Sequence, residues 1–360
     1  MTHEFLIQMG IVIYALLLRV SLIGWDERDN IPDFISHNGI FHTLKSDIKD
    51  IVDFLKISYP DNESILVGCR AETSDSYDCC EYDIIVLQKE RGNNSIKKTK
   101  NYNLHKLNGK TLEIVTLNKE ELVPNANINF LDYIDLTSST FKSNSESSFE
   151  RIKAHNIKNF NAYTKRKSVK FALDCTSISK QITNGTFDQK LSSLHLKMMS
   201  FSVLELFIQL FHNDYLRPTH LKYQINNIKE NNLKTKESID IVLEYLQLER
   251  SNISTITRSE KSLFFLLSHK KHHNRHLYNH NVGEILGSKL NYFKDQSMYV
   301  DASLLIHSFV RRQSFDADYI KNYNRLLNQI LDVQIKEKII LLKEIETLFN
   351  INKSFIKNIY

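Results

Sequence analysis

Two acidic residues, Glu81 and Asp83, stand one residue apart at the start of an apolar run. The run, residues 84–87, reads Ile-Ile-Val-Leu and predicts a buried β-strand. Because side chains alternate along a strand, both carboxylates should point to the same face of the sheet. Two like charges held this close are unfavourable unless a cation lies between them. The spacing therefore predicts a divalent-cation site, and such a cation can carry phosphate oxygens.

The segment that precedes the acidic pair predicts a second short strand and a turn. Apolar residues 65–67 end at Gly68, which Cys69 and Arg70 follow. A glycine after a strand favours a tight turn, and successive backbone amides in such a turn can receive a phosphate group. A phosphate group could therefore be received between these two strands.

Gly68-Cys69-Arg70-Ala71 and the segment from Glu81 to Val86 together resemble the minimal nucleotidyltransferases of the DNA polymerase beta superfamily. Their signature reads Gly-Ser-Arg-Ala-x-Gly, a short variable loop, and Ser-Asp-x-Asp-Leu-hydrophobic-Val. The resemblance covers residues 35–135. It implies a metal-dependent transfer of a nucleoside monophosphate from a nucleoside triphosphate, with ATP as the expected donor, to a hydroxyl acceptor. The acceptor, a protein side chain, an RNA end or a small molecule, stays open.

The resemblance also implies roles for single residues. A third carboxylate usually stands on a neighbouring strand, and Glu113 is the best candidate in this sequence. The expected catalytic residues, which would also hold Mg²⁺ or Mn²⁺, are Glu81, Asp83 and Glu113. The expected nucleotide-binding residues are Gly68, Cys69 and Arg70.

The sequence departs from the family signature at several positions. Cys69 replaces the serine, Glu81 replaces the first aspartate, and Glu72-Thr73 stands where a second glycine is usual. A thiol is a weaker hydrogen-bond donor than a hydroxyl group, and the longer glutamate could hold a metal less tightly. An inactive nucleotidyltransferase-like module, used for protein interaction or nucleotide sensing, therefore remains an alternative.

The expected fold class is α+β, with a small mixed sheet followed by an all-α bundle. The predicted divisions are an apolar segment at 1–30, a nucleotidyltransferase-like domain at 31–136, a Ser-rich linker at 137–149 and a helical domain at 150–360. Asn108-Gly109 between two apolar runs is a hairpin signal. This hairpin would place Glu113 on the strand beside Asp83. The helical pattern at 40–57 predicts a helix before the first strand.

The composition is that of a soluble globular protein, with 42 % hydrophobic and 25 % charged residues. Only 9 glycines and 4 prolines in 360 residues favour long helices. The net charge of +5 permits a nucleotide or RNA partner without requiring one, and DNA is not an expected partner. The 4 cysteines lack zinc-ribbon spacing, so they are interpreted as reduced thiols of a cytoplasmic protein.

Two further segments leave alternatives open. Residues 5–24 are long and apolar enough to span a membrane, so a membrane-anchored protein is the alternative to a cytoplasmic one, and a packing helix would look the same. The histidine-rich segment 269–280 contains Arg275 and His280. It could be a solvated basic face, a nucleic-acid contact, a metal site, or the Arg-x4-6-His pattern of HEPN-type ribonucleases, which it resembles.

Overall fold

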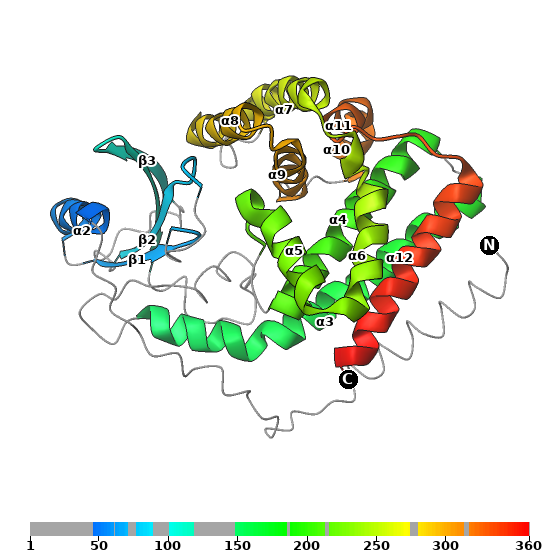
Figure 1. Cartoon of the computed structure of the whole chain (residues 1–360), viewed down its shortest axis with the longest axis horizontal. Helices are drawn as coiled ribbons and strands as arrows, with labels where there is room; N and C mark the ends of the chain where they lie inside the picture. Colours follow the sequence, from blue (N-terminus) through cyan, green and yellow to red (C-terminus); the bar gives the residue numbers. More distant parts are fainter. Residues whose placement is uncertain are drawn as a thin grey trace.

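The structure, a computed structural model, describes residues 46–60, 62–70, 77–88, 101–118, 148–185, 188–212, 216–273, 280–312 and 317–359. Within them, a small mixed sheet near the start of the chain is followed by helices only (Figure 1). The predicted α+β fold class is therefore confirmed. The apolar segment 1–30, with its possible membrane span at 5–24, lies outside the described residues.

The sheet has the strand order β1-β2-β4-β3. The strands are β1 (Glu63–Val67), β2 (Tyr82–Gln88), β3 (Asn101–Leu107) and β4 (Lys110–Asn118). The central pair β2 and β4 is parallel, whereas β1 pairs with β2 and β3 with β4 in antiparallel fashion. The predicted hairpin is confirmed: Asn108 and Gly109 turn the chain with φ of 49° and 77°, values that suit this pair of residues.

Helix α2 (Ser46–Ser58) covers one face of the sheet and not the other. Its apolar side chains pack on every second residue of the central strands; the shared core comprises Ile51, Leu55, Leu66, Tyr82, Ile84, Val86, Leu112 and Ile114. Strand alternation therefore sends Glu81, Asp83 and Glu113 to the face that α2 does not cover. The residues of the predicted helix that precede Ser46 lie outside the described residues.

The helical part begins with α3 (Ser148–Thr183), two residues before the predicted domain start. Residues 137–147 of the predicted linker lie outside the described residues. The elements that follow are α4 (Gln189–His212), η3 (Pro218–His220), α5 (Leu221–Asn231), α6 (Leu233–Leu246), η4 (Leu248–Arg250), α7 (Ile253–His273), α8 (His280–Asp295), α9 (Tyr299–Arg312), α10 (Ala317–Asn322), α11 (Asn324–Ile330) and α12 (Lys338–Ile359).

Helix α4 forms the centre of the helical part, because it contributes side chains to both of its hydrophobic cores. In the part of the chain that the structure describes, it is also the one helix with the length and apolarity of a membrane span, over Gln189–Phe211. Since 67 % of its most apolar window is buried inside the protein, its apolarity is accounted for by core packing.

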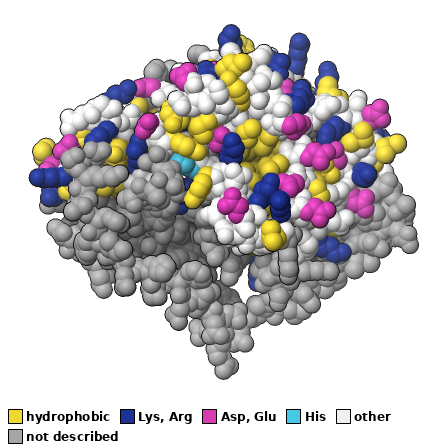
Figure 2. All heavy atoms as spheres, viewed as in Figure 1, with side chains coloured by type: hydrophobic (Ala, Val, Ile, Leu, Met, Phe, Trp, Pro, Cys, Tyr) yellow, Lys and Arg dark blue, Asp and Glu magenta, His cyan; other side chains and the backbone are white. Residues whose placement is uncertain are grey.

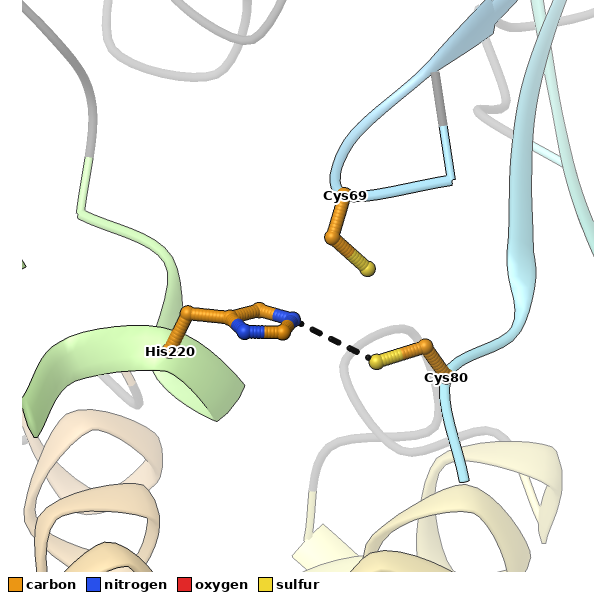
Figure 3. A group of neighbouring side chains, drawn as sticks. All are labelled: Cys69, Cys80 and His220. Carbon is orange, nitrogen blue, oxygen red and sulfur yellow. Dashed lines mark hydrogen bonds between the residues drawn. The ribbon is translucent and has the colours of Figure 1, made fainter. Parts of the chain in front are cut away.

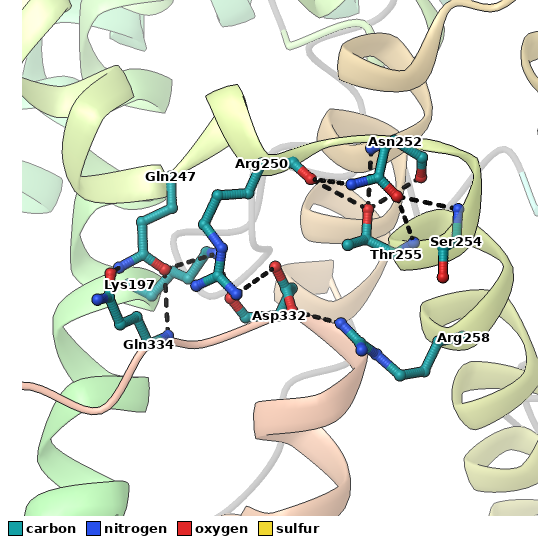
Figure 4. A network of polar contacts seen from close by, with 9 residues as sticks. All are labelled: Lys197, Gln247, Arg250, Asn252, Ser254, Thr255, Arg258, Asp332 and Gln334. Carbon is teal, nitrogen blue, oxygen red and sulfur yellow. Dashed lines mark hydrogen bonds and ion pairs between the residues drawn. The ribbon is translucent and has the colours of Figure 1, made fainter.

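A buried polar network joins α4 to two turns of the bundle (Figure 4). The Lys197 ammonium donates to Oε1 of Gln247 at 3.5 Å and to the carbonyl oxygen of Asp332 at 3.2 Å. Desolvation by burial lowers the pKa of Lys197 to about 7, against the opposing charge of Asp332. Arg258 closes the network with a 2.6 Å ion pair to Asp332. The loop after α11 is thereby held against α4.

The histidine-rich segment is divided between two helices. Helix α7 ends at His273 and α8 begins at His280, and residues 274–279 lie outside the described residues. The open interpretations of this segment, including the one centred on Arg275 and His280, stay predictions.

Charges of both signs are interspersed on the molecular face drawn in Figure 2. Lysine and arginine side chains alternate there with acidic ones, and apolar side chains lie singly or in small groups between them. This distribution agrees with the mild net charge of +5.

Candidate functional site

The three acidic residues singled out in the sequence come together on the open face of the sheet. Asp83 on β2 lies opposite Glu113 on β4 in the parallel register, and Glu81 precedes Asp83 by two residues on the same side. One carboxylate oxygen from each lies within 4.8 Å of the others. This separation fits oxygen ligands around one hard cation, because each metal–oxygen bond is about 2.0–2.6 Å long.

The turn after β1 lies directly beside this carboxylate group. Gly68 has φ of 77°, and a Cβ atom there would collide with the Asp83 carboxylate. The glycine is thus required twice, for the backbone conformation and for the close approach of Asp83. The predicted phosphate-receiving turn and the predicted metal ligands occupy one place in the structure.

Burial makes this carboxylate group costly in the absence of a cation. Glu81 is only 7 % exposed, and its Oε2 atom is buried without a hydrogen-bond partner among the described residues. Leaving a buried charged oxygen unsatisfied is unfavourable by at least about 1–3 kcal/mol. A buried oxygen without a partner is expected where a ligand completes the site.

The helical part places an ammonium group at the same carboxylates. Lys289 on α8 forms a 2.5 Å ion pair with Oε1 of Glu81, and both side chains are mostly buried. Burial lowers the pKa of Lys289, but the charges of Glu81 and Asp83 outweigh it and leave the pKa above its ordinary value. No signal in the sequence distinguishes Lys289, because a lysine in an amphipathic helix is most often solvent-exposed.

Glu113 differs from an ordinary glutamate in its affinity for a proton. Desolvation by burial, followed by the charge of Glu81, raises its pKa to about 7, although Lys289 acts in the opposite direction. At neutral pH this carboxyl group therefore exchanges a proton readily. A group with such a pKa suits general acid–base chemistry.

Arg70 holds the loop that leads into β2. Its guanidinium donates to the carbonyl oxygen of Cys80 at 3.2 Å and to that of Tyr77 at 3.1 Å, and it lies 5.2 Å from the centre of the Tyr82 ring. The expected role of Arg70 in phosphate binding stays a prediction. Its contacts give it a structural role in fixing the segment that carries Glu81.

A second group of ligating side chains, which the sequence analysis did not foresee, surrounds Cys80. Its Sγ atom lies 3.4 Å from Nε2 of His220, and the thiol of Cys69 points toward the same place (Figure 3). One ligand atom from each of the three lies within 4.8 Å of the others. Hydrogen bonds from Cys69, Cys79 and His220 lower the pKa of Cys80 well below its usual range.

The cysteines are free thiols in the structure, in agreement with their interpretation from the sequence. What the sequence analysis could not supply is their convergence. His220 lies 140 residues from Cys80 in the chain, so no local spacing signals that they meet. Cys69 and Cys80 flank the loop between β1 and β2, whereas His220 belongs to the helical part.

The chain matches no protein-family model, and no curated protein is significantly similar to it in sequence. The resemblance to the nucleotidyltransferases therefore depends on the motif residues and on their placement in the fold. The placement agrees with a metal-binding site for an oxygen-coordinated cation.

Proposed function

We propose that this protein is a divalent-cation-dependent nucleotidyltransferase, which transfers a nucleoside monophosphate from a nucleoside triphosphate to a hydroxyl acceptor and releases pyrophosphate. The observation that carries the proposal is the convergence of Glu81, Asp83 and Glu113 within 4.8 Å beside the Gly68 turn. The donor set consists of carboxylates alone, which suits Mg²⁺ or Mn²⁺.

Each residue has a defined role in the proposal. Glu81 and Asp83 would hold the cations, which neutralise charge on the phosphates of ATP. Glu113 would accept the proton of the attacking hydroxyl group. The backbone amides at Gly68 and Cys69 would face the phosphates. No covalent nucleophile is required, since positioning and charge neutralisation suffice for phosphoryl transfer.

The test is transfer of label from the α-phosphate of ATP in the presence of Mg²⁺ or Mn²⁺. Labelling should occur on the protein itself or on added RNA, and Asp83→Asn should reduce the rate at least about 100-fold, because it removes one metal ligand. Asp53→Asn is the matched control, since Asp53 is an exposed carboxylate on α2, away from the site. Equal labelling by the wild type and Asp83→Asn would refute the proposal.

A second candidate function rests on Lys289. Its ammonium contacts Glu81 at 2.5 Å, where an active enzyme of this type would hold a cation. If the ammonium permanently replaces the metal, the protein is an inactive nucleotidyltransferase-like module for interaction or nucleotide sensing. Calorimetry with ATP and Mg²⁺ separates the two: an enzyme binds both together, whereas the module binds ATP without Mg²⁺ or not at all.

We further propose the cytoplasm as the location, because free thiols and a nucleotide substrate suit that compartment. The membrane-anchored alternative depends on residues 5–24. Fractionation of the full-length protein distinguishes them, since an anchored chain stays with the membrane after a high-salt wash.

A further inference from the structure

The thiol and imidazole group of Cys69, Cys80 and His220 is chemically different from the neighbouring carboxylates. It offers two sulfur atoms and one nitrogen atom, all within 4.8 Å of one another. A tetrahedral zinc ion, with bonds of about 2.3 Å to sulfur and 2.0–2.1 Å to nitrogen, separates such ligand atoms by about 3.6–3.8 Å. The 3.4 Å between Sγ of Cys80 and Nε2 of His220 is close to that spacing.

We propose that Cys69, Cys80 and His220 form a zinc site, separate from the carboxylate site, with a water molecule as the fourth ligand. Cys79 lies outside this group, although its thiol hydrogen-bonds to Cys80. Cys69 and Cys80 bind Zn²⁺ as thiolates, so binding releases to solvent every proton that the two sulfur atoms still carry. Two thiolates and a neutral imidazole balance the charge of the ion, so the loaded site is neutral.

The surroundings hold the ligands in place. The His220 ring is 4 % exposed and stacks on Tyr77, with 4.6 Å between ring centres and 11° between planes. Buried Asp301 on α9 lies close enough for its charge to interact with His220. A carboxylate beside a zinc-bound imidazole commonly fixes the orientation of the ring. Arg70 donates a hydrogen bond to the main-chain carbonyl oxygen of Cys80 and so restrains the position of this ligand.

The site gives a physical reason for the cysteine at position 69. A serine there would offer phosphate a better hydrogen-bond donor, but a thiolate binds Zn²⁺ far better than a hydroxyl group does. The side chain of Cys69 would thus serve the zinc, while its backbone amide stays available to a phosphate. The two neighbouring sites would select different ions, a soft site for Zn²⁺ and an all-oxygen site for Mg²⁺.

Zinc at this place would also connect the two parts of the chain. Cys69 and Cys80 belong to the loop that carries Gly68 and leads to Glu81, and His220 precedes α5 in the helical part. The metal would hold the catalytic loop against the bundle, independently of the ion pair between Lys289 and Glu81.

The experiment uses the untagged full-length protein, produced with zinc in the medium and purified under reducing conditions without chelators. Metal content is measured by mass spectrometry, and affinity by competition with a chromophoric chelator. We expect about one Zn²⁺ per chain, and Co²⁺ in its place should show the absorption of a tetrahedral thiolate site. Cys80→Ser and His220→Asn should weaken binding at least about 100-fold, since they remove direct ligands.

Cys79→Ser and Asp83→Asn are the controls, and both should keep zinc affinity within about threefold, because neither removes a proposed ligand. Should Cys80→Ser fold poorly, alkylation of the wild type decides the question: zinc should protect Cys69 and Cys80 and leave Cys79 reactive. Three outcomes would each overturn the proposal. The protein could be free of zinc although its thiols are reduced, or Cys69 and Cys80 could form a disulfide. The third outcome is a zinc ion that is lost in Asp83→Asn but kept in Cys80→Ser. None of these readouts depends on transferase activity.

Discussion

Replacement of Lys289 by methionine tests whether the carboxylate group is a cation site. Methionine keeps most of the unbranched side chain, one atom shorter, and removes its charge. The ion pair with Glu81 is 2.5 Å long, with the two side chains 12 % and 8 % exposed. Removing one partner of such a buried pair costs about 3–5 kcal/mol, because the remaining charge stays buried without compensation. Lys289→Met should therefore lower the melting temperature by several degrees.

A divalent cation should restore the stability that Lys289→Met loses. Without the ammonium, Glu81, Asp83 and Glu113 form an uncompensated group, and Mg²⁺ or Mn²⁺ can bind where Nζ of Lys289 was. At a concentration of one hundred times its dissociation constant, a bound cation stabilises the folded state by about 2.7 kcal/mol. The wild type should gain less, since the cation must first displace the ammonium. A lower pH should also stabilise the folded state of Lys289→Met, because protons then neutralise its carboxylates.

Lys294→Met provides the matched control on the same helix. Lys294 forms a 2.6 Å ion pair with Glu260, with side chains 17 % and 13 % exposed. Lys294→Met should lower the free energy of unfolding by a similar amount, and Mg²⁺ should not restore it. Thermal unfolding is followed by circular dichroism at constant ionic strength, with NaCl replacing MgCl₂. Equal Mg²⁺ effects on the two variants would refute the cation site.

Two more predictions follow from the geometry. In urea unfolding, Gly68→Ala should lower the free energy of unfolding by at least about 1 kcal/mol more than Gly109→Ala does. Both positions have φ of 77°, but only a Cβ atom at Gly68 would meet Asp83. Equal losses in the two variants would contradict the close approach of Asp83 to Gly68. Folding lowers the pKa of Lys197 from 10.5 to about 7, so the unfolded chain binds the proton more tightly than the folded one. The wild-type free energy of unfolding should therefore rise between these pH values by up to about 1.4 kcal/mol per pH unit. Lys197→Met should remove this pH dependence. Denaturant titrations at pH 7, 8 and 9 measure the slope, and a variant that keeps it would show that another group titrates there.

The sheet was accessible to sequence reasoning because its signals are local. The strand from Tyr82 to Gln88, the hairpin at Asn108-Gly109 and the shared face of Glu81 and Asp83 all follow from alternation and turn chemistry. The parallel pairing of β4 with β2, which sets Glu113 opposite Asp83, joins strands that are not consecutive in the chain, and the sequence indicated it only through the resemblance to the nucleotidyltransferases.

The contributions of the helical part were not accessible in this way. Lys289 lies 208 residues from Glu81, and His220 lies 140 residues from Cys80. Each belongs to a helix or turn whose local sequence is unremarkable, and only the packing of α8 and η3 against the sheet loops brings them to the sites. Tertiary contacts between distant segments leave no periodic signal in a single sequence.

Both sites therefore depend on the same packing between the sheet and the bundle. The sheet supplies the carboxylates and the thiols, while the bundle supplies the ammonium of Lys289 to the first group and the imidazole of His220 to the second. A movement of the bundle away from the sheet would expose the carboxylates to Mg²⁺ and at the same time remove one zinc ligand. Zinc binding and access of Mg²⁺ should then oppose each other, because each favours a different arrangement of the same two surfaces.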